Sequence, residues 1–593
     1  MKDIKQAVIF FSFYLKVYWK ALSLGAILTI MATYFQVTAP VYMGKSLTEL
    51  ARFLTTWMNP MTRSTASKEH FYTALLMLLA FYIANAIAMF LSSMLISKVS
   101  SEATGKMRHG LFGKLQKMTI KYFDSHQDGK ILSLFTSDLD NIFNAMNQAI
   151  FSLFSNLALW IGVIIVMFQQ NTKLAWVTVI STPVAILFAW FVIKKARTAI
   201  DQQQDAVGRL NGFVNEQING EKVIITNGLQ AQSLHQFTDY NKDVRQTTLK
   251  GQIYSGLLFP LMQGMSLINL AVVIFFGSWL VLNDGMDKAV GLGLVATFVS
   301  FSQQYYQPIT QITSIYNMLQ LAITGARRLS EVHQQDEEIE SENTENLPYI
   351  QDKVTLKNIH FSYNPGKEIL HDVTIEVKKG EMVALVGPTG SGKTTVMNLL
   401  NRFYDVDAGQ VLFDNQDIRH VSLQSLRDHV GIVLQDAVLF SGTIAENIKF
   451  GQPTIDDEAM IEAAKQAHIH DFISSLPDGY QTKISDENSV FSTGQKQLMS
   501  IARTILTNPD LLILDEATSN VDTVTENRIQ KAMDNVIAGR TSFVIAHRLK
   551  TILNADKIVV LRDGQVIESG THHELLEKEG FYAELYHNQM VFE

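Results

Sequence analysis

A glycine-rich stretch in the second half of the chain could bind phosphate. Residues 387–394 read GPTGSGKT, which is the pattern G-x-x-x-x-G-K-[ST]. Glycines let successive backbone N–H groups curl around phosphate oxygens, and a helix that begins directly after them adds positive potential. We expect Lys393 to reach the β- and γ-phosphates of a nucleotide and the hydroxyl of Thr394 to bind Mg²⁺. The predicted nucleotide-binding residues here are Gly387, Pro388, Thr389, Gly390, Ser391, Gly392, Lys393, Thr394 and Thr395.

Two carboxylates follow a second apolar run, Leu511–Leu514, further along the chain. If this run is a parallel strand beside the phosphate loop, its terminal carboxylate, Asp515, becomes a Mg²⁺ ligand. Glu516, one residue further, is then placed to polarise the attacking water as general base. The alternative is an acidic strand end exposed to solvent, and the phosphate loop upstream argues against it.

The flanking sequence predicts the elements that position these groups. The apolar run Met382–Val386 predicts a buried strand directly before the loop, and we expect a helix from Thr395 onward. Strand, loop and helix in this order are the context that the phosphate-loop pattern requires. The C-terminal part is therefore predicted to be an α/β P-loop nucleotide-binding domain.

The first half of the chain predicts an all-α domain with six transmembrane helices. About 20 apolar residues are needed to cross the hydrocarbon core of a bilayer. Six runs of at least this length lack Asp, Glu, Lys and Arg, and so many charge-free runs are improbable as buried helices of a soluble protein. They are Ala21–Met43, Phe71–Ser97, Gln148–Phe168, Leu174–Ile193, Ser255–Leu282 and Val290–Leu319.

Lysines and arginines predict how these spans are oriented, because they accumulate on the cytoplasmic side. They cluster before the first span and after the second, fourth and sixth, so both termini are predicted to be cytoplasmic. The two inward connections are about 50 to 60 residues long, and a structureless loop of that length is unusual. We expect the spans to continue as helical rods, with a turn between Gly220 and Gly228.

Composition divides the chain and excludes several classes of function. The predicted domains are a transmembrane domain at 1–332, an acidic linker at 333–353 and a nucleotide-binding domain at 354–593. The chain has no cysteine, which excludes disulfides, thiolate catalysis and cysteine metal sites. Its net charge of −8 gives no support for nucleic-acid binding, which usually shows a basic face.

Together these motifs resemble the ATP-binding-cassette (ABC) family, over the full length of the chain. By that resemblance, Tyr363 is the aromatic residue that stacks on adenine and Gln435 is a glutamine that contacts Mg²⁺ and water. His547 matches a switch histidine at the γ-phosphate, and Asp522 belongs to the stretch called the D-loop. The resemblance implies catalytic roles for Glu516, His547 and Gln435, and a Mg²⁺ site at Thr394, Gln435 and Asp515.

The membrane half is similar to that of the family's exporters. Residues 122–129, followed by Asp138, look like the end of the exporters' first inward loop, and residues 324–329 look like their exit from the sixth span. Six spans followed by one ATPase domain are typical of half-size exporters in a bacterial cytoplasmic membrane.

The chain departs from the family pattern at the signature sequence, Leu-Ser-Gly-Gly-Gln, which contacts ATP held by the opposite subunit. Here it is Phe491, Ser492, Thr493, Gly494 and Gln495, and a Cβ at position 493 would crowd a close approach to phosphate. Residues 486–490 also lack the Gly-Glu-Arg-Gly run that is typical of exporters directly before the signature sequence. The departures resemble heterodimeric bacterial multidrug exporters and predict a second half-transporter as partner. Neutral drift in a homodimer is the alternative.

The polar residues of the sixth span are the part of the sequence that bears on the transported substrate. Amides and tyrosines are costly against lipid unless they face protein or a cavity. A cavity lined by these side chains would suit small amphipathic substrates. An equal alternative is that the same side chains hold helices together. A lipid or peptide exporter, a non-transporting regulator and an importer on the same scaffold also stay open. The candidate cavity residues are Gln303, Gln304, Tyr305, Tyr306, Gln307 and Gln311.

Overall fold

The computed structural model describes residues 2–283, 286–338, 345–435, 437–452, 454–484, 491–515, 522–546 and 549–590. The chain forms two compact units. One consists of Met1–Gln116 and Gln127–Gln335, and the other of Lys117–His126 and Asp336–Glu593. A short segment from the first half of the sequence therefore folds with the C-terminal unit, which the sequence boundaries did not anticipate.

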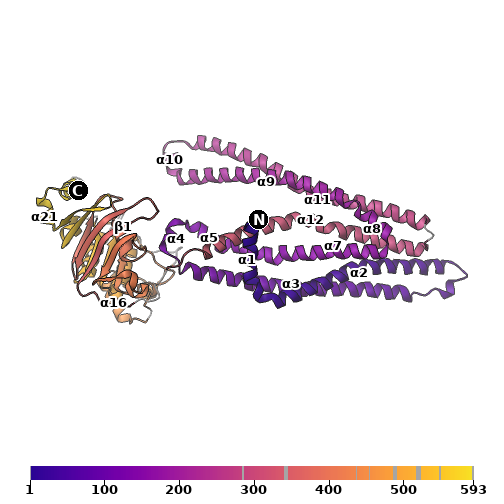
Figure 1. Ribbon diagram of the computed structural model, residues 1–593, viewed down its shortest axis with the longest axis horizontal. Coiled ribbons are helices and arrows are strands. Elements are labelled where there is room, and N and C mark those ends of the chain that lie inside the picture. Colours follow the sequence, from indigo (N-terminus) through magenta and orange to yellow (C-terminus); the bar gives the residue numbers. More distant parts are fainter. Residues whose placement is uncertain are drawn as a thin grey trace. The chain divides into compact units, whose positions relative to one another are not determined.

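The N-terminal unit is helical throughout its described residues. Figure 1 shows its long helices running side by side, with α2 beside α3 and α9 beside α11. Its main helices are α1 (Lys2–Leu15), α2 (Trp19–Met58), α3 (Glu69–Leu115), α5 (Asp128–Ser133), α6 (Leu139–Asn144), α7 (Ile150–Gln170), α8 (Thr172–Val179), α9 (Thr182–Asn219), α10 (Glu221–Thr226), α11 (Gln230–Asn283) and α12 (Lys288–His333).

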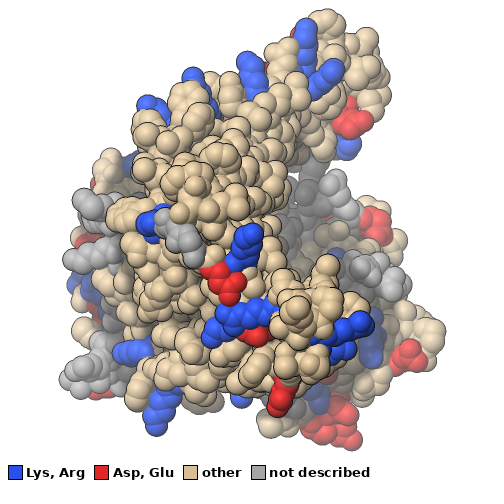
Figure 2. Space-filling model, turned by 90° about the vertical axis from the view of Figure 1, so that its right-hand side faces the viewer, with Lys and Arg blue, Asp and Glu red and all other residues tan. Residues whose placement is uncertain are grey.

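The described helices confirm a helical membrane domain. Five helical stretches among the described residues are long and apolar enough to cross a membrane, and they contain the first five predicted spans. The sixth span lies in α12, a 46-residue helix. Figure 2 views the side of this unit where the short hairpins lie, and it shows charged side chains scattered over a mostly uncharged surface.

Two features of these helices have local causes. The predicted turn in the second inward connection is α10, which is flanked by Gly220 and by Gly228 with φ 67°. The fourth span is not one continuous helix, because α8 ends at Val179 and α9 begins at Thr182. Pro183 in the first turn of α9 lacks the N–H that a continuous helix would need, which accounts for the interruption.

The C-terminal unit contains two larger sheets. A four-stranded antiparallel sheet has the order β2-β1-β4-β5, and a six-stranded sheet has the order β12-β11-β3-β10-β9-β6. In the larger sheet the five strands from β11 to β6 are parallel, and β12 pairs antiparallel at one edge. The strands are β1 (Lys353–Phe361), β2 (Leu370–Lys378), β3 (Met382–Val386), β4 (Ala408–Phe413), β5 (Gln416–Asp417), β6 (Val430–Val433), β9 (Leu511–Asp515), β10 (Thr541–Ile545), β11 (Lys557–Arg562) and β12 (Gln565–Gly570).

The parallel sheet is buried on both faces, which explains why its strands read as continuous apolar runs. Successive side chains of a strand point to opposite faces. In β3, Met382 and Ala384 pack into one hydrophobic core, whereas Val383 and Leu385 pack into the other. The strand that leads to the phosphate loop is thus packed between two hydrophobic cores, one on each face of the sheet.

Candidate functional site

The phosphate loop connects β3 to α13 (Lys393–Leu400). Gly390 and Gly392 have φ angles of 83° and 103°, in the left-handed region that favours glycine. Since Gly392 is the N-cap, α13 begins at Lys393, two residues earlier than the sequence predicted. In an α-helix the first N–H groups have no carbonyl partner within the helix, and those of α13 adjoin the loop, as phosphate binding requires.

The predicted phosphate-binding lysine lies inside the curl of the loop. The Lys393 ammonium donates hydrogen bonds to the carbonyl oxygens of Gly387 (2.7 Å) and Pro388 (2.9 Å), and its side chain is buried. Burial lowers the pKa of Lys393 from its ordinary value, and the charge of Asp515 acts in the opposite direction. The loop thus concentrates positive charge next to a carboxylate.

The carboxyl ends of the parallel strands bring the other predicted groups to the same edge of the sheet. Asp515 is the last residue of β9, and Gln435 follows β6 by two residues. The sequence predicted a parallel strand beside the phosphate loop for Asp515. In the structure β9 is parallel to β3, and β10 lies between them. The arrangement still serves the site, since parallel strands end at one edge.

These groups suit a hard cation. A hydroxyl at Thr394, an amide at Gln435 and a carboxylate at Asp515 supply oxygen atoms, the ligands that Mg²⁺ prefers. Thr394 and Gln435 are exposed and Asp515 is half-buried, so their oxygens are accessible from solvent. Glu516 and His547, predicted to be catalytic, lie outside the described residues.

Tyr363, the predicted adenine-stacking residue, is held against the helix of the phosphate loop. Its hydroxyl donates to Thr395 Oγ1 (3.2 Å) and accepts from the amide of Asn398 (3.1 Å). Its ring meets the rings of Phe361 and Tyr404 edge to face. Sequence reasoning missed Asn398 and Tyr404 because neither belongs to a phosphate-binding pattern.

The signature residues form the start of α18 (Thr493–Thr507). Ser492 is its N-cap: its hydroxyl accepts from the Gln495 N–H, while the Gln495 side chain accepts from the Ser492 N–H. Thr493, the first helical residue, is exposed, and Gly494 is buried. The threonine methyl and hydroxyl thus stand on the surface at this helix N-terminus. Residues 486–490 lie outside the described residues.

Asp522 of the predicted D-loop is also a helix cap. Its carboxylate accepts from the N–H groups of Val524 (3.1 Å) and Thr525 (3.0 Å) at the start of α19 (Thr523–Ile537). The backbone N–H of Thr525 contributes most to holding the pKa of Asp522 below its ordinary value. The carboxylate therefore stays ionised near neutral pH.

The polar residues of the sixth span divide into two groups. Tyr305 and Tyr306 are buried, and their hydroxyls lie 2.6 Å from those of Thr182 and Ser181 at the break between α8 and α9. These contacts join α12 to the start of α9, which is the helix-packing alternative that the sequence left open beside a cavity. Among the predicted glutamines, Gln304 is half-buried, and the exposed ones are Gln303, Gln307 and Gln311.

The two stretches of the membrane half that looked like exporter sequences meet in the structure. Arg328 donates to the buried carboxylate of Asp138 at 2.8 Å. Sequence reasoning singled out both stretches but not this pair, because their separation of 190 residues leaves no local signal.

Comparison with known proteins agrees with this architecture. A family model described as "ABC transporter transmembrane region" matches residues 20–309, and one described as "ABC transporter" matches residues 370–519. The chain is 37% identical to a fatty acid ABC transporter ATP-binding/permease protein of Mycobacterium bovis, with 86% of this chain and 80% of that protein covered. It is 34% identical to an ATP-dependent lipid A-core flippase of Syntrophus aciditrophicus, with 87% and 85% covered.

A solved structure shows the same fold over almost the whole chain. The structure of a bacterial Atm1-family ABC exporter with ATP bound superposes with a TM-score of 0.75 and 26% sequence identity. The match covers 96% of this chain and 98% of that chain.

Proposed function

Because this chain belongs to the ABC transporter family and is an ATPase coupled to export, we propose that it exports amphipathic, multidrug-type compounds as one subunit of a heterodimer. The observation that carries the proposal is an asymmetry. The phosphate loop and Asp515 match the pattern of a nucleotide site, whereas Thr493 places a branched side chain at the N-terminus of α18, which in the proposed assembly faces the partner's ATP.

The proposed hydrolytic site uses groups at the carboxyl edge of the parallel sheet. Lys393 and the N–H groups of the loop bind the phosphates, and Tyr363 stacks on the base. Mg²⁺ is held by Thr394, Asp515 and Gln435. Glu516 polarises the attacking water, and His547 contacts the γ-phosphate. The partner's signature sequence completes this site.

The Glu516→Gln variant tests the hydrolytic assignment. We expect it to lose at least about a hundredfold in ATP turnover, the usual contribution of a general base, and to bind ATP normally. Turnover is measured by phosphate release and binding by equilibrium dialysis. Glu577→Gln, at an exposed position of α21 (His572–Glu577), is the matched control. Turnover that persists in Glu516→Gln would remove Glu516 as the base.

Expression of the chain alone tests the heterodimer. We expect little ATP turnover from the purified chain, because two Thr493 signatures would face two phosphate loops. Thr493→Gly should raise turnover of the lone chain, since it removes the Cβ from the phosphate approach. Robust, cooperative turnover by the unaltered chain alone would rule out an obligate heterodimer.

We further propose that the membrane is the cytoplasmic membrane of a bacterium, with both termini in the cytoplasm. The lysine and arginine clusters after the second, fourth and sixth spans support this orientation. Protease digestion of inside-out vesicles measures it: the C-terminal domain should be cleaved, and the hairpin at 59–68 should be protected.

Lipid export is the second candidate function. The named substrates of the two relatives, a fatty acid and lipid A-core, favour it. Inside-out vesicles with both subunits separate the candidates. Uptake of a fluorescent cationic dye supports multidrug export, whereas uptake of a fluorescent fatty acid without the dye supports lipid export.

A further inference from the structure

A cavity in the C-terminal unit lies at the edge of the parallel sheet opposite the phosphate loop. Its volume is about 300 Å³, at the lower end of the range for small-molecule sites. It is lined by Met382, which begins β3, and by Gly539 and Asp556, which come just before β10 and β11. The phosphate loop leaves β3 at its other end, after Val386. The cavity is therefore separate from the nucleotide site.

The floor of this cavity is apolar. Met382 and Val544 come from one face of the sheet, Met533 and Ile537 come from α19, and all four pack into the same hydrophobic core. The short helix α20 (Leu549–Leu553) contributes to the lining beside them. Methionine side chains are flexible and adapt to partners of different shape. A floor of this kind favours the hydrophobic part of a ligand.

The rim of the cavity is acidic. Asp534 and Asp556 are both exposed, and neither forms an ion pair with any residue that the structure describes. Asp534 accepts a hydrogen bond from the Gln530 amide (3.0 Å), and Asp556 accepts one from the Met382 N–H (2.8 Å). These donors are neutral, so each carboxylate keeps its negative charge.

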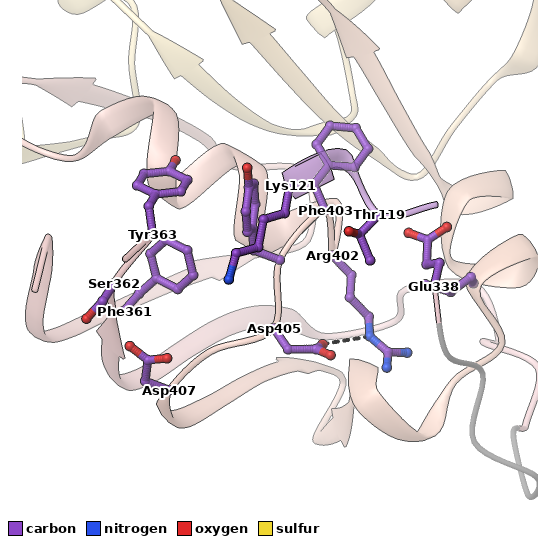
Figure 3. A pocket seen from close by; sticks show the side chains of 12 residues that line it. Thr119, Lys121, Glu338, Phe361, Ser362, Tyr363, Arg402, Phe403, Asp405 and Asp407 are labelled. Atoms are coloured by element: carbon purple, nitrogen blue, oxygen red, sulfur yellow. Dashed lines mark hydrogen bonds and ion pairs between the residues drawn. The ribbon is translucent and has the colours of Figure 1, made fainter. Parts of the chain in front are cut away.

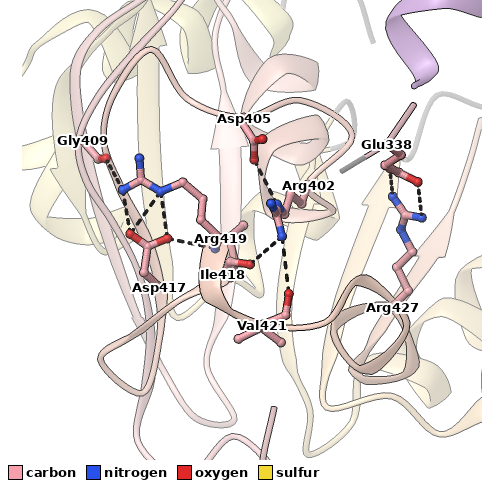
Figure 4. Close-up of polar contacts among 9 residues, drawn as sticks. All are labelled: Glu338, Arg402, Asp405, Gly409, Asp417, Ile418, Arg419, Val421 and Arg427. Carbon is pink, nitrogen blue, oxygen red and sulfur yellow. Dashed lines mark hydrogen bonds and ion pairs between the residues drawn. The ribbon is translucent and has the colours of Figure 1, made fainter. Parts of the chain in front are cut away.

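The cavity drawn in Figure 3, elsewhere in the same unit, differs in this respect. Its Asp405 carboxylate is paired with Arg402 (2.9 Å), and its Glu338 carboxylate is paired with Arg427. Figure 4 shows both pairs. Arginine neutralises those two carboxylates, whereas the two carboxylates of the acidic rim have no such partner within the described part of the chain.

A buried hydroxyl lies on the same face of the sheet as the apolar floor. Ser542 is fully buried, and its Oγ has no hydrogen-bond partner among the described residues. Because successive side chains of a strand alternate, Ser542 points to the same face as Val544, and it stands opposite Met382 in the neighbouring strand. Two floor residues therefore flank a hydroxyl that is available to a ligand.

We propose that this cavity binds a small amphipathic cation, such as an aromatic amine. The ammonium group lies at the rim, where the two carboxylates attract a positive charge. The apolar part of the ligand packs on the floor, and the Ser542 hydroxyl hydrogen-bonds a polar substituent that reaches past Met382. An anion of the same shape is repelled by the rim. The site does not depend on which substrate the membrane domain transports.

The absence of cysteine from the chain allows a test at the cavity itself. Asn554→Cys is introduced at the exposed rim of the full-length chain in lipid nanodiscs, and labelling by the neutral reagent N-ethylmaleimide is followed by intact-mass spectrometry. We expect benzyltrimethylammonium to slow labelling about fivefold at about four times its dissociation constant. Benzylsulfonate, an anion with the same ring, should leave the rate unchanged. Ser474→Cys, at an exposed position of α17 (His470–Ser475), is the control and should not respond to either compound.

Variants at the rim identify the groups that bind the probe. Asp534→Asn and Asp556→Asn each remove one charge at constant size, and the second keeps an acceptor for the Met382 N–H. Each should weaken the affinity for benzyltrimethylammonium about threefold, within the range for exposed ion pairs. Ala538→Phe puts a ring into the lining, keeps both carboxylates and should abolish protection. Glu577→Gln on α21 is the matched charge control and should leave the affinity unchanged.

Three results would overturn the proposed site. They are an absence of protection by the cation, equal protection by the cation and the anion, and an unchanged affinity in both aspartate variants. Equilibrium dialysis with ATP shows whether each variant is folded, because the nucleotide site lies at the other edge of the sheet. If Ala538→Phe does not fold, the two aspartate variants, whose altered side chains are exposed, still decide the outcome.

Discussion

At the scale of single residues, the phosphate loop depends on glycines that differ in what a side chain would meet. A Cβ added to Gly387, whose φ is 151°, would overlap the carbonyl oxygen of Leu561 in the neighbouring strand β11. A Cβ added to Gly390 would meet no atom within 4 Å, although its φ of 83° still disfavours a side chain. The first glycine is therefore required by packing as well as by backbone conformation.

We expect Gly387→Ala to lower the midpoint of thermal unfolding of the C-terminal unit clearly more than Gly390→Ala does. Backbone strain costs about 1–3 kcal/mol at either position, and only Gly387→Ala adds the overlap with Leu561. The measurement is a thermal melt without nucleotide, so that effects on ATP binding do not enter. Equal midpoints for the two variants would show that packing against β11 is unimportant.

At the scale of elements, small residues bring two membrane helices into backbone contact. Gly44 of α2 and Gly293 of α12 are buried against each other, and a Cβ on either would overlap the other's carbonyl oxygen. Thr297 donates to the carbonyl oxygens of Gly293 (2.9 Å) and Pro40 (3.2 Å) at the same crossing. Close packing of this kind stabilises helix association in a membrane, where burial from water does not contribute.

Gly293→Ala should therefore destabilise the membrane domain by about 1–3 kcal/mol, the cost of overpacking a closely packed site. Gly264→Ala in α11 is the matched control, because its added Cβ meets no atom within 4 Å and alanine favours the helix. Aggregation temperature in detergent, followed by size-exclusion chromatography, measures the difference. The packing argument fails if the two variants behave alike.

A hydrogen-bond network at the break between α8 and α9 also holds membrane helices together. Ser181 contacts both Tyr306 (2.6 Å) and the amide oxygen of Asn269 (3.2 Å), and Asn269 donates to Ser302 (2.9 Å). Tyr306, Asn269 and Ser302 are buried and Ser181 is half-buried, and an unsatisfied polar group in such a place is costly. The network ties α9, α11 and α12 together where Pro183 has interrupted the fourth span.

At the scale of the whole molecule, neither unit is continuous in sequence, and each needs contacts that tie distant segments together. In the C-terminal unit, Asp414 ties the end of the linker to the turn between β4 and β5. Its carboxylate accepts from the N–H groups of Gln351 (2.5 Å), Asp352 (2.8 Å) and Lys353 (2.9 Å). Burial raises the pKa of Asp414, but these three donors outweigh it and hold the pKa below its ordinary value.

Since the folded-state pKa of Asp414 is lowered, its contribution is present above the ordinary pKa of about 4 and is lost as pH falls through the folded value. We expect Asp414→Asn to reduce stability by about 1–2 kcal/mol at pH 7, a typical value for hydrogen bonds to a charged group near solvent. The difference from the unaltered chain should shrink below about pH 4.

Denaturant unfolding followed by intrinsic fluorescence at several pH values measures this difference. Asp407→Asn is the control, because Asp407 is an exposed carboxylate directly before β4 of the same sheet. A difference that does not change between pH 7 and pH 3 would contradict the role assigned to the Asp414 carboxylate.

The local groups of the nucleotide site were predictable from sequence, because they lie within one short stretch or at the end of one strand. Strand β3 has the predicted bounds, and Asp515 ends β9 as expected. Backbone conformation and apolar runs are local properties, so one sequence suffices to predict them. The spans were predictable for the same reason, since their length is set by the bilayer.

Only the tertiary structure decided which distant groups meet. It inserted β10 between the strand of the loop and the strand of Asp515, and it paired Tyr404 with Asp124 across 280 residues. It also placed Tyr305 and Tyr306 in helix packing, where the sequence left a cavity equally open. The physical reason is that a hydrogen bond or ring contact between distant residues depends on strand order and helix crossing. Neither is encoded in the residue types that happen to meet.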